Sequence, residues 1–232
     1  MLSAIDAAAM IDISAVRTQH TLSDILELVE YAKKYRFVNV HVLPCWVSTL
    51  AEMIRDIDGV YVGSPVGFPS GGEKIITKVL TAQQLIEDGV QEMDIVMNIG
   101  KLKNGNYEYV NRELREIVGL TDKQIIIKVI IEISVLTDEE ILDACDIAIQ
   151  SGADFVKTGT GWIFEPVNIN RIRKIKEYCG SQIKVKAAGG IRTLDDFIAL
   201  HEIGVERMGI NLHSAIEIVE NCQKEWIKSL CV

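Results

Sequence analysis

The chain has 232 residues, of which 48% are hydrophobic and 25% charged, and its formal net charge at pH 7 is -9. This length accommodates one α/β barrel more readily than two domains, so a single domain over residues 1–232 is expected. The negative charge argues against a general nucleic-acid binder and against a protein that binds membrane surfaces.

The first half of the chain alternates short apolar runs with amphipathic helix patterns. Thr21 and Asp24 form a capping-box start, and apolar residues at helical spacing follow them. The strands of this half are expected at 10–14, 37–43, 60–66 and 92–98. The helices are expected from Thr21 onward and at 47–55, 73–87 and 107–118.

The second half continues the alternation, with further capping pairs at Thr137 and Glu140 and at Thr193 and Asp196. Its strands are expected at 125–132, 155–158, 183–187 and 205–210, and its helices at 137–150, 168–178, 193–203 and 214–230. Eight strands that alternate with helices favour a parallel (β/α)8 barrel, or TIM barrel, over an open doubly wound sheet. The open sheet would place a Gly-x-Gly-x-x-Gly turn after its first strand, and the sequence has none there.

The cysteine pattern and the first residues indicate the compartment. The five cysteines are scattered, odd in number and without a Cys-x-x-Cys pair, so neither disulfides nor a structural zinc site are expected. Met1 to Met10 lacks the basic start of a signal peptide, and no apolar run is long enough to span a membrane. We therefore expect a cytoplasmic protein. The cysteines are Cys45, Cys145, Cys179, Cys222 and Cys231.

Reactive side chains gather at the carboxyl ends of the expected strands, where a barrel of this kind has its active site. Strand parity directs residues 94 and 98, 128 and 132, and 184 and 186 toward the lumen. A charge on the opposite face would be buried against the helices without a partner. The candidates are Asp12, His41, Asp94, Asn98, Lys128, Glu132, Lys157, Lys186 and Asn211.

Two lysines on neighbouring strands suit amine chemistry. Lys157 ends an apolar run, and Lys186 ends the next strand. A nucleophilic lysine must be neutral, and both burial and a second cation nearby favour the neutral amine. Asp94 would then act as general acid and base around a carbinolamine and a Schiff base. The alternative is that these groups only form ion pairs that fill the barrel, and this alternative has most weight for Lys128.

Glycine turns follow the same strands and indicate an anion site. Gly159, Gly161, Gly189 and Gly190 expose backbone N–H groups near helix starts, where such barrels commonly bind phosphate. A Gly-Gly pair alone is a weak signal, and its place beside Lys186 strengthens it. The four histidines have no metal-ligand spacing, so neither a metal site nor a metal-dependent aldolase is expected.

Six motifs occur in a fixed order along the chain. They are Met-Ile-Asp at 10–12, Val-Gly-Phe-Pro-Ser-Gly-Gly at 66–72, Glu-Met-Asp-Ile-Val-Met-Asn-Ile-Gly at 92–100, Lys-Val-Ile-Ile-Glu at 128–132, Gly-Ala-Asp-Phe-Val-Lys-Thr-Gly-Thr-Gly at 152–161 and Lys-Ala-Ala-Gly-Gly-Ile-Arg at 186–192. With this ordered set the chain resembles, over nearly its whole length, the deoxyribose-phosphate aldolases, which are class I aldolases of the (β/α)8 type.

The resemblance implies a reaction and a role for each matching residue. The family reversibly cleaves 2-deoxy-D-ribose 5-phosphate to acetaldehyde and D-glyceraldehyde 3-phosphate, without a metal or an organic cofactor. Lys157 would form the Schiff base, Lys186 would lower the pKa of that lysine, and Asp94 would relay protons. Asp12 and Thr158 would place substrate hydroxyls and the lysine. The phosphate would be held by Gly161, Gly189 and Gly190.

The chain departs from the family's usual pattern at the end that binds the acceptor aldehyde and phosphate. His41 stands where the family usually has cysteine, and Trp162 where a smaller or basic residue is common. After the last strand the usual Ser-Ser pair is missing, and Asn211 and Leu212 occupy this region. Asn211 can donate a hydrogen bond to phosphate, whereas the Leu212 side chain cannot. We expect His41 and Asn211 to contact the substrate.

Three functions remain open from the sequence. The first is deoxyribose-phosphate aldolase, and the second is a related lysine-dependent aldolase for a modified or non-phosphorylated sugar or another aldehyde. The third is a phosphosugar-binding or isomerase-like barrel without imine chemistry. The expected partners are small sugar phosphates and aldehydes rather than nucleic acid or membranes. Because members of the family often associate, the resemblance also implies a homo-oligomer, either a dimer or a tetramer.

Overall fold

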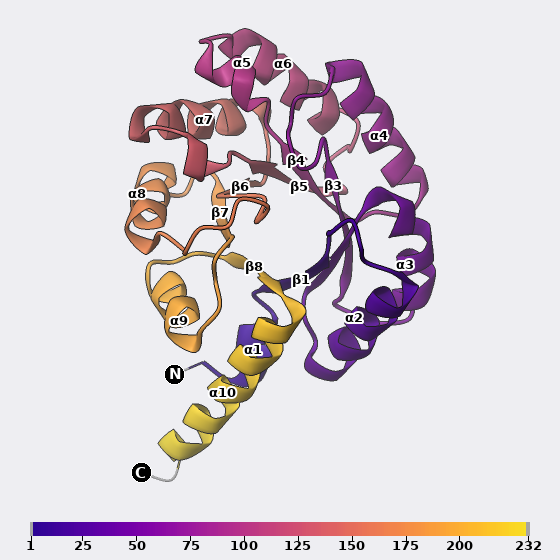
Figure 1. Ribbon diagram of the computed structural model, residues 1–232, viewed down its shortest axis with the longest axis vertical. Coiled ribbons are helices and arrows are strands. Elements are labelled where there is room, and N and C mark those ends of the chain that lie inside the picture. Colours follow the sequence, from indigo (N-terminus) through magenta and orange to yellow (C-terminus); the bar gives the residue numbers. More distant parts are fainter. Residues whose placement is uncertain (1, 231–232) are drawn as a thin grey trace.

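In the computed structural model, which describes residues 2–230, eight parallel strands close into a barrel in chain order. The helices between them form a ring around the strands (Figure 1), so the predicted TIM barrel is confirmed. The strands are β1(Ile11–Ala15), β2(Asn39–Val42), β3(Tyr61–Val66), β4(Glu92–Val96), β5(Ile126–Ile130), β6(Phe155–Lys157), β7(Lys184–Ala188) and β8(Arg207–Asn211).

The helices lie close to their expected positions, with a few short elements that the sequence pattern did not reveal. The α-helices are α1(Ala4–Ala8), α2(Leu22–Tyr35), α3(Val47–Ile54), α4(Ile75–Glu87), α5(Ile99–Lys103), α6(Tyr107–Val118), α7(Asp138–Ser151), α8(Ile169–Cys179), α9(Leu194–Glu202) and α10(Leu212–Leu230). Two short 3-10 turns, η1(Pro44–Trp46) and η2(Ile133–Val135), follow β2 and β5. The additions to the expected set are α1, α5 and the two 3-10 turns.

The three capping boxes expected from the sequence fix where their helices begin. Thr21 and Asp24 form one at α2, and the pairs at Thr137 and Thr193 form the others at α7 and α9. Asn98 also caps a helix, because its side chain accepts a hydrogen bond from the backbone of Lys101 at the start of α5. Strand β4 therefore ends before Asn98, and the expectation that this side chain faces the lumen is wrong.

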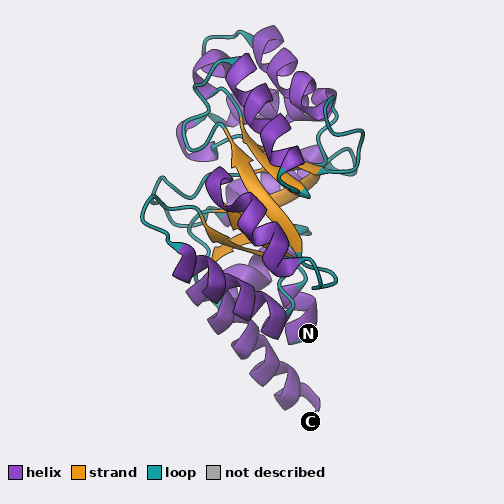
Figure 2. Ribbon diagram, turned by 90° about the vertical axis from the view of Figure 1, so that its right-hand side faces the viewer, coloured by secondary structure: helices purple, strands orange, loops and turns teal. Residues whose placement is uncertain are grey.

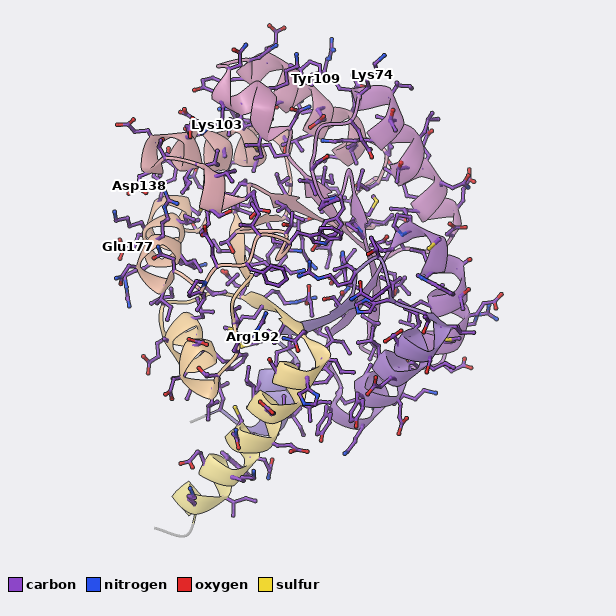
Figure 3. All side chains as sticks on the ribbon, in the orientation of Figure 1. Lys74, Lys103, Tyr109, Asp138, Glu177 and Arg192 are labelled. Atoms are coloured by element: carbon purple, nitrogen blue, oxygen red, sulfur yellow. The ribbon has the colours of Figure 1, made fainter. Side chains whose placement is uncertain are left out.

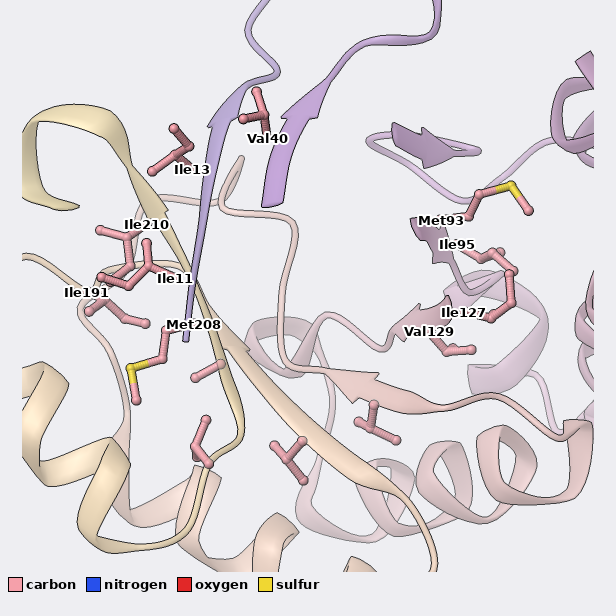
Figure 4. Packing of buried hydrophobic residues seen from close by; sticks show 14 of the residues in the cluster. Ile11, Ile13, Val40, Met93, Ile95, Ile127, Val129, Ile191, Met208 and Ile210 are labelled. Carbon is pink, nitrogen blue, oxygen red and sulfur yellow. The ribbon is translucent and has the colours of Figure 1, made fainter. Parts of the chain in front are cut away.

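Alternation along the strands separates an apolar outer face from an inner face that carries the buried charged groups. Ile11 and Ile13 of β1, Met93 and Ile95 of β4 and their equivalents pack in the layer between strands and helices (Figure 4). Removing these side chains from water supplies the main driving force for closing the ring. The residues between them, such as Asp12, point into the lumen because successive side chains of a strand face opposite ways.

The two ends of the described chain lie together. Helix α1 packs against α10, and α10 extends beyond the ring of helices (Figure 2). No helix among residues 2–230 is long and apolar enough to cross a membrane. Met1 and Cys231, which entered the expectations about a signal peptide and disulfides, lie outside the described residues. The other cysteines are free thiols.

One buried ion pair outside the barrel should matter for stability. Lys78 of α4 and Glu113 of α6 are both fully buried, 2.9 Å apart, and Lys78 Nζ also donates to the Val96 carbonyl at 2.7 Å. Burial lowers the pKa of Lys78 and raises the pKa of Glu113, while their pairing opposes both changes. The Lys78→Met variant would leave the carboxylate buried without its cation.

We expect Lys78→Met to lower the free energy of unfolding by about 3 to 5 kcal/mol. The double variant Lys78→Met with Glu113→Leu should recover most of the loss, because it removes both buried charges. Urea unfolding followed by circular dichroism measures the difference. Equal losses in the single and double variants would mean that side-chain packing, not charge, stabilises this contact.

Candidate active site

A cavity of about 340 Å³ opens at the carboxyl ends of the strands. The loops after β1, β6, β7 and β8 form its rim, and lumen side chains form its floor. The sequence-predicted residues that line it are Asp12, His41, Lys157, Gly161, Lys186, Gly189, Gly190 and Asn211. Most of the predicted site residues therefore come together at one mouth.

Strand register places the two lysines side by side. Lys157 pairs with Lys186 across β6 and β7, and Asp94 pairs with Lys128 across β4 and β5. One oxygen of Asp94, Oδ2, accepts hydrogen bonds from Lys157 Nζ at 2.7 Å and from Lys186 Nζ at 2.8 Å. Asp94 itself is fully buried beneath them, and the Lys157 side chain is 9% exposed against 1% for Lys186. Lys157 is thus the more accessible amine of the pair.

Lys186 is held more deeply than Lys157. Its Nζ also lies 2.5 Å from Asp12 Oδ2, so two carboxylates surround it. Burial lowers the pKa of Lys186 to about 8, against the opposing effect of Asp12 and Asp94 and with help from the neighbouring lysines. Burial acts to raise the pKa of Asp94, but Lys157 and Lys186 hold it well below the usual range.

A second layer of charges fills the barrel below these groups. Lys128 Nζ contacts Glu92 and lies 3.0 Å from Asp12, and Arg207 donates to Asp12 at 2.7 Å and to Glu92 at 2.9 Å. Burial acts to lower the pKa of Lys128, yet the surrounding carboxylates raise it. The ion-pair interpretation is therefore right for Lys128. Sequence reasoning missed Glu92 and Arg207, although strand parity with Asp94 and Gly209 would have placed both in the lumen.

The buried charges do not balance if every group is ionised. The carboxylates are those of Asp12, Glu92 and Asp94, and the basic groups are those of Lys128, Lys157, Lys186 and Arg207. Three anions face four potential cations, so the cluster reaches neutrality when one amine gives up its proton. A low-dielectric interior penalises excess charge, which favours one neutral lysine.

His41 is a neutral side chain in this cluster. Burial lowers its pKa to about 3, with Asp94 opposing the change and the lysines adding to it. Its Nδ1 lies 3.3 Å from Asn39 Oδ1, and its Nε2 lies 3.6 Å from Asp94 Oδ2 without a hydrogen-bond partner among the described residues. A Cβ at Gly63 would come within 2.2 Å of the ring, so the missing side chain of Gly63 makes room for His41.

Glycines shape the rim in the turns that follow β6 and β7, the two strands that carry the lysines. Gly161, Gly189 and Gly190 have φ angles of 72°, 95° and 75°, in the region that other residues rarely adopt. A Cβ at Gly190 would also lie 2.4 Å from the backbone of Glu165 and Val167. At Gly190 the backbone leaves no room for any other residue, and at Gly161 and Gly189 the positive φ angles favour glycine.

Two other predicted residues have local bonding roles. The Thr158 hydroxyl donates to the Ala188 carbonyl at 3.1 Å and accepts from the Ala188 N–H at 2.9 Å, which joins β6 to β7 away from the cavity. Asn211 lines the cavity, while its amide group exchanges hydrogen bonds with Ser214 at the start of α10. Thr158 therefore does not contact the cavity in this arrangement.

Glu132 lies beyond the end of β5, so strand parity no longer applies to it. Its φ angle is 49°, and its Oε2 accepts from the Thr160 N–H at 3.1 Å. The side chain supports the turn after β6 instead of facing the lumen, which corrects the expectation. Among residues 2–230, no group of three or more His, Cys, Asp or Glu side chains is placed to hold a metal ion.

The fold and the lysine pair define the class of the protein, an aldolase-type enzyme built on a (β/α)8 barrel. A family model described as DeoC/LacD family aldolase matches residues 62–211. The deoxyribose-phosphate aldolase of Rhizobium meliloti (strain 1021) is 43% identical over 217 residues, which cover 94% of this chain and 87% of that protein. The chain belongs to the DeoC/LacD aldolase family.

Solved structures agree with this family. The aldolase QR15 has a TM-score of 0.88 at 35% identity, and the match covers 96% of this chain and 98% of that one. The deoxyribose phosphate aldolase from Aeropyrum pernix, described as having a unique tetrameric structure, has a TM-score of 0.86 at 28% identity. That match covers 94% of this chain and 92% of the other.

Proposed function

We propose that this lyase is a class I aldolase that reversibly cleaves 2-deoxy-D-ribose 5-phosphate to acetaldehyde and D-glyceraldehyde 3-phosphate. The observation that carries the proposal is the pair of lysine amines on one buried oxygen of Asp94, with Lys157 facing the cavity. The names of the relatives support the substrate, because deoxyribose-phosphate aldolases match nearly the whole chain.

The proposed reaction begins at Lys157. Its neutral amine attacks the aldehyde carbon C1 of the open sugar, and loss of water from the carbinolamine gives an imine. A base removes the proton of the C3 hydroxyl, the C2–C3 bond breaks, and its electron pair moves into the imine to form an enamine. D-Glyceraldehyde 3-phosphate leaves, and protonation at C2 followed by hydrolysis releases acetaldehyde and restores the lysine.

Asp94 and Lys186 would manage the protons of this cycle. Because both amines donate to Asp94 Oδ2, a proton lost from Lys186 can be replaced from Lys157 through this carboxylate. The neutral amine then lies at the cavity, and the remaining charge stays between Asp12 and Asp94. Asp94 is positioned to accept and return a proton next to the reacting nitrogen.

The rate should rise with pH up to the point where Lys186 loses its proton. The free amine predominates at pH values above the pKa, and burial lowers the pKa of Lys186 to about 8. We expect kcat/KM to increase about tenfold per pH unit from about pH 6 and to level off near pH 8. His41, with a pKa of about 3, should add no step to this range. Steady-state assays of sugar phosphate cleavage measure the profile, and a flat profile would contradict the assignment.

Borohydride trapping tests the imine directly. Incubation with acetaldehyde and borohydride should leave an ethyl group on Lys157, which peptide mass spectrometry can locate. A folded protein that gives no adduct with acetaldehyde would exclude acetaldehyde-donor imine chemistry. Turnover of a phosphosugar without any adduct would instead support the isomerase-like alternative.

The substrate itself needs a separate comparison. Cleavage of 2-deoxyribose 5-phosphate should be faster at low concentration than cleavage of 2-deoxyribose, because the rim glycines supply N–H groups for a phosphate. A clear preference for the free sugar would favour the related aldolase with a non-phosphorylated substrate.

The setting of the reaction is also part of the proposal. The family's usual role in deoxyribonucleotide catabolism suits a cytoplasmic enzyme. We propose that residues 1–232 form a single domain. The scattered cysteines, odd in number and without a Cys-x-x-Cys pair, support a reducing compartment. A homo-oligomer, a dimer or a tetramer, is proposed with support from the tetramer described for the Aeropyrum pernix structure.

A further inference from the structure

Arg17 brings a positive charge to the glycine side of the cavity. It follows β1 by two residues, and its half-buried side chain lines the cavity together with Gly161, Gly189 and Gly190. Arg192 also lines the cavity, but its side chain is exposed. Figure 3 shows Arg192 near the start of α10, whereas Asp138 and Glu177 lie at the outer edge of the molecule. Arg17 is therefore the less solvated guanidinium of the two.

Contacts on several sides fix the Arg17 side chain. Its Nη2 donates to the Gly161 carbonyl at 2.5 Å. Its guanidinium carbon lies 5.2 Å from the ring centre of Trp162 and 5.1 Å from that of Phe164. Trp162 is itself supported by an edge contact with Phe68, with ring centres 5.7 Å apart. A guanidinium that is stacked and hydrogen-bonded loses little further freedom when it binds a ligand.

Among residues 2–230, no carboxylate lies within ion-pair distance of Arg17. Neither Arg17 nor Arg192 takes part in an ion pair among residues 2–230. The acidic residues of the cavity lining are Asp12, Asp24 and Glu27. Asp12 is paired with Lys186 and Arg207, and the Asp24 carboxylate accepts hydrogen bonds from Thr21 at the start of α2. A half-buried cation without a carboxylate, beside turns rich in N–H groups, fits an anionic ligand group.

We propose that Arg17 binds the 5-phosphate of the substrate and sets the preference for phosphorylated sugars, with Trp162 as the positioning residue that stacks its guanidinium. Trp162 follows the turn at Gly161 but carries no charge. Arg17, in the loop after β1, places its positively charged guanidinium against the same turn. The inference rests on the proposed function and adds the residue that recognises the phosphate.

The test compares 2-deoxyribose 5-phosphate with 2-deoxyribose in wild type and in Arg17→Gln. The ratio of kcat/KM for the phosphorylated over the free sugar should fall about 10- to 100-fold, mainly through KM for the phosphorylated sugar. Arg17→Lys keeps the charge without the planar fork and should give an intermediate ratio. Trp162→Ala should lower the ratio as well, because the guanidinium loses its platform. Arg173→Gln, which removes an exposed arginine of α8 outside the cavity, is the control with the same charge change.

An unchanged ratio in folded Arg17→Gln would overturn the inference, and so would a collapse of the ratio in Arg192→Gln alone. Titration calorimetry with inorganic phosphate gives a second readout that needs no turnover, and Arg17→Gln should bind phosphate at least about tenfold more weakly. If wild type neither cleaves the sugar phosphate nor forms a borohydride adduct, the proposed function fails. The phosphate titration then decides the role of Arg17 separately, and equal binding by wild type and variant would reject it.

Discussion

Replacing Lys157 with methionine is expected to lower kcat for sugar phosphate cleavage by about 10⁴-fold or more. Methionine keeps an unbranched side chain of similar length, so the wall of the cavity is largely preserved while the amine is lost. Without this amine no imine forms, and the electron pair of the breaking C–C bond has no acceptor. Coupled assays of acetaldehyde release measure kcat, and borohydride trapping should leave no ethyl group on position 157.

Lys184→Met is the matched control for this variant. Lys184 belongs to β7, as Lys186 does, but it is exposed at the amino end of the strand, where its Nζ lies over the Phe155 ring. The same substitution at this end of the barrel should change kcat less than about twofold. Substantial activity in Lys157→Met, with an adduct now found at Lys186, would instead assign the imine to the deeper lysine.

The barrel could be predicted from the sequence because each of its units carries a local signal. Capping boxes such as Thr137 with Glu140 mark helix starts through contacts three residues apart. Alternating apolar residues mark strands that are covered on one face. Helices α1 and α5 were not predicted, since each has only five residues and too few turns to develop an apolar stripe.

The site could be predicted only in part, because chain closure creates contacts that no local pattern contains. Lys157 and Lys186 lie on adjacent strands, so their proximity follows from counting strands. Arg207 meets Asp12 only because β8 pairs with β1, and this joins residues from opposite ends of the chain. Arg17 is a loop residue whose place depends on stacking against Trp162, and a sequence does not specify the direction of such a loop.

Glu92 shows that two carboxylates on the same face of one strand can have different roles in the closed barrel. It follows the strand parity of Asp94, but it lies one layer deeper, with Lys128, Arg207 and Asn39 as partners. Depth in the barrel therefore separates a carboxylate that holds the fold together from one that faces the reacting lysines. Position along β4 decides this difference: Glu92 comes two residues before Asp94, opposite Ile126 of β5, whereas Asp94 lies opposite Lys128.

Replacing Asp94 with asparagine should lower kcat by about 10²- to 10⁴-fold, which is the usual effect of removing a general acid or base. The amide has nearly the same shape as the carboxylate, but it cannot take a proton from the carbinolamine or return one to the enamine. Asp94 stays ionised at neutral pH, because Lys157 and Lys186 hold its pKa well below the usual range despite burial. The loss should therefore persist across the neutral and alkaline range.

The same variant should move the pH dependence of imine formation to lower pH. Asp94 raises the pKa of Lys186, against the larger effect of burial, so neutralising Asp94 lets Lys186 release its proton more easily. Imine formation would then begin at lower pH while turnover stays slow, a combination that misfolding cannot produce. Asp94→Glu should recover part of kcat, and Glu92→Gln, in the layer below, should affect stability more than kcat. If Asp94→Asn kept wild-type kcat, the proton relay would have to belong to another group, and His41, whose Nε2 lies 3.6 Å from Asp94, would be the next side chain to replace.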